Sequence, residues 1–266
     1  MTINTDIWKK SPPFSVNSLP KWPCPFCGKG TLAIDYKTLK FKKSKRQFDP
    51  DYFKMDDFED NFLLGVLTVL STAIEKASWV QSRFVGFLDC KSCGDTVSFT
   101  GRAEIYRKNP QEKIDRPARL YPEFFSPSIQ VFSLSELYPE NVRKLLLKSF
   151  SLMFSDPASA ANIVRRSLEA LLDELEVEKV NGKGKKLNLF QRIALFEHQV
   201  PDLTGMLNAI RFVGNEGSHS GDVSRADLMD SYEILDYVLD DLYLRSKTRA
   251  RVQRLSQKVS SSYSNK

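Results

Sequence analysis

The stretch that decides the fold of the C-terminal half of this 266-residue chain is Ile210-Arg211-Phe212-Val213-Gly214-Asn215-Glu216-Gly217-Ser218-His219. It closes a segment whose apolar residues recur at helical spacing. At about 100° per residue, Arg211, Asn215 and His219 fall within one stripe roughly 80° wide and off the apolar face. This polar stripe predicts three candidate catalytic residues facing one substrate. The alternative is a helix end, weakened by Gly214 and Gly217, where Asn215 and His219 bond to neighbouring backbone.

Helical spacing extends over the whole region from residue 139 to residue 247 and predicts a bundle of about five helices. Asp156-Pro157 is a helix start, because an acidic N-cap is followed by proline at the first helical position. Ser224 with Asp227 resembles a capping box and predicts the start of a long last helix. We expect the basic residues 248–266 to form a flexible tail.

The four cysteines of the chain form two Cys-x-x-Cys-Gly corners, Cys24-Pro25-Phe26-Cys27-Gly28 and Cys90-Lys91-Ser92-Cys93-Gly94. Two such corners supply the four ligands of a tetrahedral site, so Cys24, Cys27, Cys90 and Cys93 predict one structural zinc ion. A redox pair would not be expected twice. The whole segment 28–89 separates the inner cysteines, which is far beyond the spacing of a compact zinc ribbon.

Alternating apolar residues on both sides of the corners predict strands at 31–41, 79–88 and 96–106. A helix is expected near 57–76, inserted between the two halves of a zinc-ribbon-like unit that spans 1–107. Residues 108–138 are rich in proline and polar residues and predict an extended linker. The fold class expected from these patterns is α+β.

The net charge of +6 is concentrated in a few basic segments. The loop that holds Lys183, Lys185 and Lys186 suits a polyanion and is a candidate nucleic-acid site. The alternative for any such segment is a solvated face. The N-terminal segment 1–20 lacks the apolar core of a secretory signal, and the longest apolar run, 62–70, is too short to span a bilayer. We therefore expect a cytoplasmic protein without a membrane partner.

The run Ala161-Asn-Ile-Val-Arg165-Arg166-Ser-Leu168-Glu169, followed on the chain by the stretch quoted first, resembles the domain-of-unknown-function 4145 family, a HEPN-like group. The resemblance covers roughly residues 121–245. It implies a helical bundle that often forms a homodimer and an association with bacterial restriction and anti-phage systems. Many relatives also carry an N-terminal Cys-x-x-Cys pair or ribbon. Some HEPN proteins are metal-independent ribonucleases whose Arg and His are separated by four to six residues, whereas the separation between Arg211 and His219 is one position longer.

Two functions follow from the sequence. The first is a non-catalytic module in which the zinc ribbon and the bundle bind RNA, another nucleic acid or a partner defence protein. The alternative is a metal-independent endoribonuclease in which His219 transfers protons, Arg211 stabilises the phosphorane and Asn215 orients either group. Arg166 and Glu169 could support the stripe across the bundle, or could form an ion pair that holds the fold.

Overall fold

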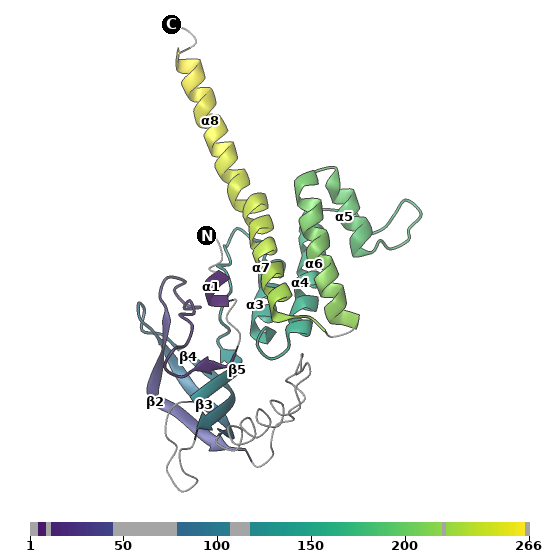
Figure 1. Cartoon of the computed structure of the whole chain (residues 1–266). Helices are drawn as coiled ribbons and strands as arrows, with labels where there is room; N and C mark the ends of the chain where they lie inside the picture. Colours follow the sequence, from purple (N-terminus) through teal and green to yellow (C-terminus); the bar gives the residue numbers. More distant parts are fainter. Residues whose placement is uncertain (1–4, 9–11, 45–78, 107–117, 220–221, 264–266) are drawn as a thin grey trace, which may run out of the picture. The chain divides into compact units, whose positions relative to one another are not determined.

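A computed structural model describes residues 5–8, 12–44, 79–106, 118–219 and 222–263 (Figure 1). The chain divides into two compact units. Lys10–Pro127 forms the sheet unit, and Met1–Lys9 together with Ser128–Lys266 forms the helical unit. This mixed architecture confirms the α+β class. The helix expected near residues 57–76 lies outside the described residues.

The sheet unit contains a five-stranded antiparallel sheet in the order β1-β5-β4-β3-β2. Its strands are β1 (Phe14–Ser15), β2 (Leu32–Lys43), β3 (Trp79–Cys90), β4 (Thr96–Tyr106) and β5 (Ala118–Ser126). The predicted alternation in β4 is confirmed, because its apolar positions Val97, Phe99, Ala103 and Ile105 are all buried. Trp22 and Phe84 join this core through edge-to-face contacts with neighbouring rings.

The predicted linker over residues 108–138 is wrong at Ala118–Ser126, which form β5 of the sheet. Ala118, Leu120 and Pro122 are buried at alternate positions, as in a strand with one solvated face. Pro122 hid this pattern, since proline normally interrupts a strand. Here it lies opposite Gly101, where the register between β4 and β5 shifts, which is a position that tolerates proline.

The helical unit contains α1 (Thr5–Trp8), α3 (Glu140–Leu152), α4 (Pro157–Glu174), α5 (Leu189–Glu197), α6 (Pro201–His219) and α7 (Arg225–Leu239). Helix α4 packs against α3, α6, α7 and α5. Both predicted helix starts are confirmed. Asp156 accepts a hydrogen bond from the backbone N–H of Ser159, and Ser224 accepts one from that of Asp227.

The basic residues expected to form a tail are helical as far as Tyr263, and their flexibility stays a prediction. Helix α7 continues through a π-helical turn, Asp240–Arg245, into α8 (Ser246–Tyr263), which extends the line of α7 in Figure 1. The physical reason is that residues 225–263 contain neither glycine nor proline, so nothing in the sequence terminates the helix. Helix α8 exposes Val252, Leu255 and Val259.

Candidate metal centre and polar stripe

The sulfur atoms of Cys24, Cys27, Cys90 and Cys93 all lie within 4.8 Å of one another. Cys24 Sγ lies 3.7 Å from Cys93 Sγ, and Cys27 Sγ lies 3.7 Å from Cys90 Sγ. A disulfide would require about 2.05 Å. Four thiolates around one zinc ion at about 2.3 Å from each sulfur would be separated by roughly 3.8 Å. The four cysteines therefore lie close together in an arrangement that could hold a metal ion such as zinc.

Strand pairing explains how the two corners meet although they are far apart in sequence. Strands β2 and β3 are antiparallel neighbours, and Leu32 at the start of β2 pairs with Cys90 at the end of β3. The N–H of Lys91 donates to the carbonyl of Thr31, which extends this pairing into the corners. The residues between the two corners thus form β2, β3 and the segment that joins these strands. Because the strands are paired, the corners lie side by side.

Each corner turns on a glycine in the left-handed region, Gly28 with φ 65° and Gly94 with φ 76°. The turns direct backbone N–H groups at sulfur. Gly30 N donates to Cys27 Sγ at 3.4 Å, and Ser92 N donates to Cys90 Sγ at 3.3 Å. Hydrogen bonds from the backbone N–H groups of Cys93 and Ser92 lower the pKa of Cys90 to about 6. Backbone N–H groups of Gly30 and Lys29 likewise lower the pKa of Cys27, so these two thiols favour thiolate, the form that binds metal. Burial raises the pKa of Cys24, and the neighbouring thiols help to raise that of Cys93.

Gly30 is required at its position by the closeness of the second corner. A Cβ atom on Gly30 would lie 2.3 Å from Cys90 Sγ and 2.8 Å from Ser92 Oγ. Sequence reasoning did not identify Gly30, because it lies outside both Cys-x-x-Cys-Gly motifs. The sequence signal that could have identified it is a glycine three positions after Cys27, between the first corner and β2.

Helix α6 runs without interruption to His219, so Gly214 and Gly217 do not end it. Arg211 Nε donates to Asn208 Oδ1 at 3.0 Å, one turn earlier. Among the described contacts no hydrogen bond joins Arg211 to Asn215. The side chain of His219 lies outside the described residues. The helix backbone therefore places the polar stripe on consecutive turns, and the predicted cluster of the three side chains stays a prediction.

The guanidinium of Arg211 lies against two exposed aromatic rings. Its Cζ atom is 4.2 Å from the ring centroid of Phe212 and 5.1 Å from that of Phe190, which reaches it from α5. Such cation–π contacts orient the guanidinium even at an exposed site. Phe190 and Phe212 were not among the predicted site residues.

Gly214 and Gly217 serve the contact between α6 and α4. A Cβ atom on Gly214 would lie 2.4 Å from the Cβ atom of Arg165, and one on Gly217 would lie 2.4 Å from the carbonyl oxygen of Ala158. Only glycine permits this close approach of two helices. The two glycines therefore serve helix packing and do not interrupt α6, which ends at His219. Bonding of Asn215 and His219 to neighbouring backbone at this helix end stays a prediction.

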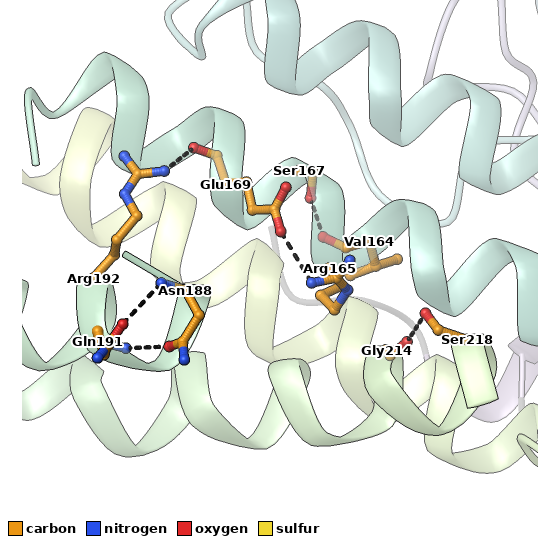
Figure 2. A network of polar contacts seen from close by, with 9 residues as sticks. All are labelled: Val164, Arg165, Ser167, Glu169, Asn188, Gln191, Arg192, Gly214 and Ser218. Atoms are coloured by element: carbon orange, nitrogen blue, oxygen red, sulfur yellow. Dashed lines mark hydrogen bonds and ion pairs between the residues drawn. The ribbon is translucent and has the colours of Figure 1, made fainter. Parts of the chain in front are cut away.

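The predicted supporting pair is arranged differently from the expectation. Glu169 accepts a hydrogen bond from Arg165 at 2.9 Å, one turn earlier on α4 (Figure 2). Arg166 is exposed. The backbone carbonyl of Glu169 also accepts from Arg192 Nη1 at 3.4 Å. Among the contacts described, those of Glu169 belong to the packing of the helical unit, and its role beside the polar stripe stays a prediction.

Arg192 is a buried cation that sequence reasoning missed. Its Nη2 atom lies 2.8 Å from Asp173 Oδ1 and donates to the carbonyl of Val177 at 3.0 Å. The guanidinium thereby ties α5 to the end of α4, where a positive charge meets the negative end of the helix dipole. A single arginine within an amphipathic segment gives no sequence signal for this role.

The loop with Lys183, Lys185 and Lys186 is ordered by Asn181. The side chain of Asn181 accepts hydrogen bonds from the N–H groups of Lys183 and Lys185, each at 3.0 Å. All three lysines are exposed. The loop therefore presents three cations on a defined turn, and its binding to nucleic acid stays a prediction.

Comparisons with known proteins support the resemblance in the helical region. Residues 148–262 match the family model described as "Domain of unknown function (DUF4145)". Residues 68–130, which include β3, β4 and β5, match another, described as "Domain of unknown function (DUF8608)". No curated protein and no solved structure matches the chain. None of the described helices is long and apolar enough to cross a bilayer.

Proposed function

We propose that the chain is a non-catalytic, zinc-binding module that binds nucleic acid. The observation that carries this proposal is the cluster of four cysteine sulfurs within 4.8 Å. Four thiolates fill a tetrahedral zinc site and leave no position for water or substrate, as in structural zinc sites. When bound, the ion supplies a cross-link between two corners, and the protein's amides stabilise the thiolates.

Nucleic acid is the proposed ligand because positive charge is exposed in excess. The net charge is +6, and the ordered loop presents Lys183, Lys185 and Lys186 to solvent. Phosphate groups attract such clusters through counterion release. A reducing compartment such as the cytoplasm is consistent with metal-binding thiols.

A homodimer formed by the helical unit is part of this proposal. Phe190 and Phe212 are large apolar side chains exposed on α5 and α6, and Tyr237 is exposed on α7. Exposed aromatic clusters commonly mark interfaces. The HEPN-like character and a role in bacterial anti-phage or restriction-type defence, with a partner defence protein, are supported by the resemblance stated above.

A second candidate function is the metal-independent endoribonuclease. The observation that favours it is the uninterrupted course of α6, which keeps Arg211, Asn215 and His219 on consecutive turns. In this case His219 would transfer the proton of the ribose 2′-hydroxyl or of the leaving oxygen, and Arg211 would stabilise the phosphorane charge.

One experiment separates the two functions. Fluorescently labelled single-stranded RNA is incubated with the full chain and with His219→Ala, each with and without a chelator. The binding module predicts a complex that weakens with salt and no cleavage. Cleavage that survives the chelator and disappears in His219→Ala would establish the ribonuclease instead. The absence of both binding and cleavage at low salt would refute the nucleic-acid function.

A further inference from the structure

The solvent-exposed face of the sheet carries apolar side chains where a solvated face is usually polar. Val85 and Phe87 on β3 are 47% and 41% exposed, and Phe124 on β5 is 51% exposed. Antiparallel sheets with one solvated face normally place polar residues there. Three large apolar groups on one such face indicate a binding surface.

The strand register shows that these side chains share one face with cations. Directly paired residues of an antiparallel sheet lie on the same face. One row across the sheet is Lys40, Val85, Thr100 and Phe124. The neighbouring row is Lys42, Arg83, Arg102 and Tyr121. The first row holds two apolar side chains, a threonine and one cation, and the second holds three cations and a tyrosine.

A single carboxylate orients the two arginines of the second row. Glu123 Oε2 lies 3.0 Å from Arg83 Nη1, and Glu123 Oε1 lies 2.7 Å from Arg102 Nε. Glu123 is the extra residue at the register shift between β4 and β5. With Lys40 and Lys42, four cations face one carboxylate in these two rows, so the rows are positively charged. Asp35, which pairs with Phe87, and Asp89 form the acidic border on one side. On the other side Glu104 lies 3.8 Å from Arg119.

We propose that this face binds single-stranded nucleic acid, an inference that rests on the nucleic-acid function proposed above. The surface is named the sheet platform and comprises Lys40, Lys42, Arg83, Val85, Phe87 and Phe124. The rings of Phe87 and Phe124 stack with bases, and the cations contact phosphates. A duplex hides the faces of its bases, so exposed rings on a sheet select single strands.

The metal corners support the sheet platform through the strands that they join. Cys90 is the last residue of β3, and its partner Leu32 is the first residue of β2. Lys40 on β2 and Val85 on β3 belong to the same pair of strands. A bound zinc ion therefore anchors the end of this strand pair nearest the corners, whereas Lys40 lies beyond the register shift between Asp35 and Lys40. Metal removal should weaken binding by loosening that end of the pair.

The test measures the fluorescence anisotropy of labelled oligouridine, oligothymidine and a DNA duplex of equal length, with the full chain at low and moderate salt. Phe87→Leu and Phe124→Leu keep the apolar surface and remove the ring, and Phe87→Tyr restores a ring. We expect each Leu variant to weaken single-strand binding at least about five-fold and Phe87→Tyr to bind like the parent. Lys40→Gln with Lys42→Gln should reduce the slope of log affinity against log salt by about 1.4, which is about 0.7 for each phosphate contact.

Matched controls distinguish this inference from the broader function. Tyr263→Leu removes an exposed ring from α8, outside every proposed site, and should bind like the parent. A triple Gln variant neutralises Lys183, Lys185 and Lys186. Binding that persists in Phe87→Leu and Phe124→Leu but is lost in the triple Gln variant would overturn the sheet platform and leave the nucleic-acid function standing. A parent protein that binds no oligonucleotide would refute both. Tighter binding to the duplex than to single strands would also overturn the inference.

Discussion

Gly30→Ala should damage the metal centre without changing any cysteine. The added methyl group would lie 2.3 Å from Cys90 Sγ, whereas non-bonded atoms prefer roughly 3.5–4.0 Å. One corner must therefore move by about 1.2 Å or more, while metal–ligand distances tolerate about 0.2 Å. The same movement disturbs the hydrogen bond from Gly30 N to Cys27 Sγ. Loss of such support typically lowers metal affinity about 10–100-fold, or roughly 1.4–2.8 kcal/mol.

The assay is a competition titration with a chromogenic zinc chelator, followed for the parent and for Gly30→Ala. Gly28→Asn is the matched control, because a Cβ atom at Gly28 meets nothing within 4 Å and asparagine tolerates its positive φ of 65°. The control should retain zinc nearly as well as the parent. An affinity of Gly30→Ala equal to that of the parent would refute the close approach of the two corners.

Three further predictions concern the helical unit. Gly214→Ala should destabilise it by about 1–3 kcal/mol in urea unfolding, because the new methyl meets the Arg165 side chain at 2.4 Å. Gly205→Ala, in the same helix with nothing within 4 Å, should be neutral or stabilising by up to about 1 kcal/mol, and equal effects would contradict the helix contact. Asp156→Ala should cost about 1 kcal/mol through loss of the N-cap, and an unchanged unfolding midpoint would contradict this. Burial, with a further contribution from the neighbouring negative charges, raises the pKa of Asp236 to about 7, above the unfolded value near 3.9. The folded state therefore binds the extra proton, and stability falls as pH rises from about 4 to 7; Asp236→Asn should flatten that fall in Tm, and an unchanged slope would count against it.

The features that could be predicted from the sequence are those set by short-range chemistry. The alternation in β4 and the caps at Asp156 and Ser224 were read correctly, because each depends on neighbouring residues alone. The four cysteines were identified as one cluster because their motif is specific. Their approach depends on the pairing of β2 with β3, and no local pattern encodes that pairing across so long a separation in sequence.

The features that were missed depend on long-range packing. The sequence indicated only that Gly214 weakens its helix, because its packing partner Arg165 lies on α4 and is distant in sequence. β5 was hidden by Pro122, which only the register shift opposite Gly101 accommodates. The exposed Phe87 and Phe124 were not recognised as one surface, because their common face is defined only once β3, β4 and β5 are aligned.

The most direct test of the zinc-binding module is the metal content of the purified full chain, measured by inductively coupled plasma mass spectrometry before any chelator is added. The account predicts one zinc ion per chain, held by Cys24, Cys27, Cys90 and Cys93. A Cys90→Ser variant should lose most of it, because Cys90 also anchors the end of β3. A zinc content near zero in folded protein that has not been exposed to a chelator would contradict the proposed zinc site.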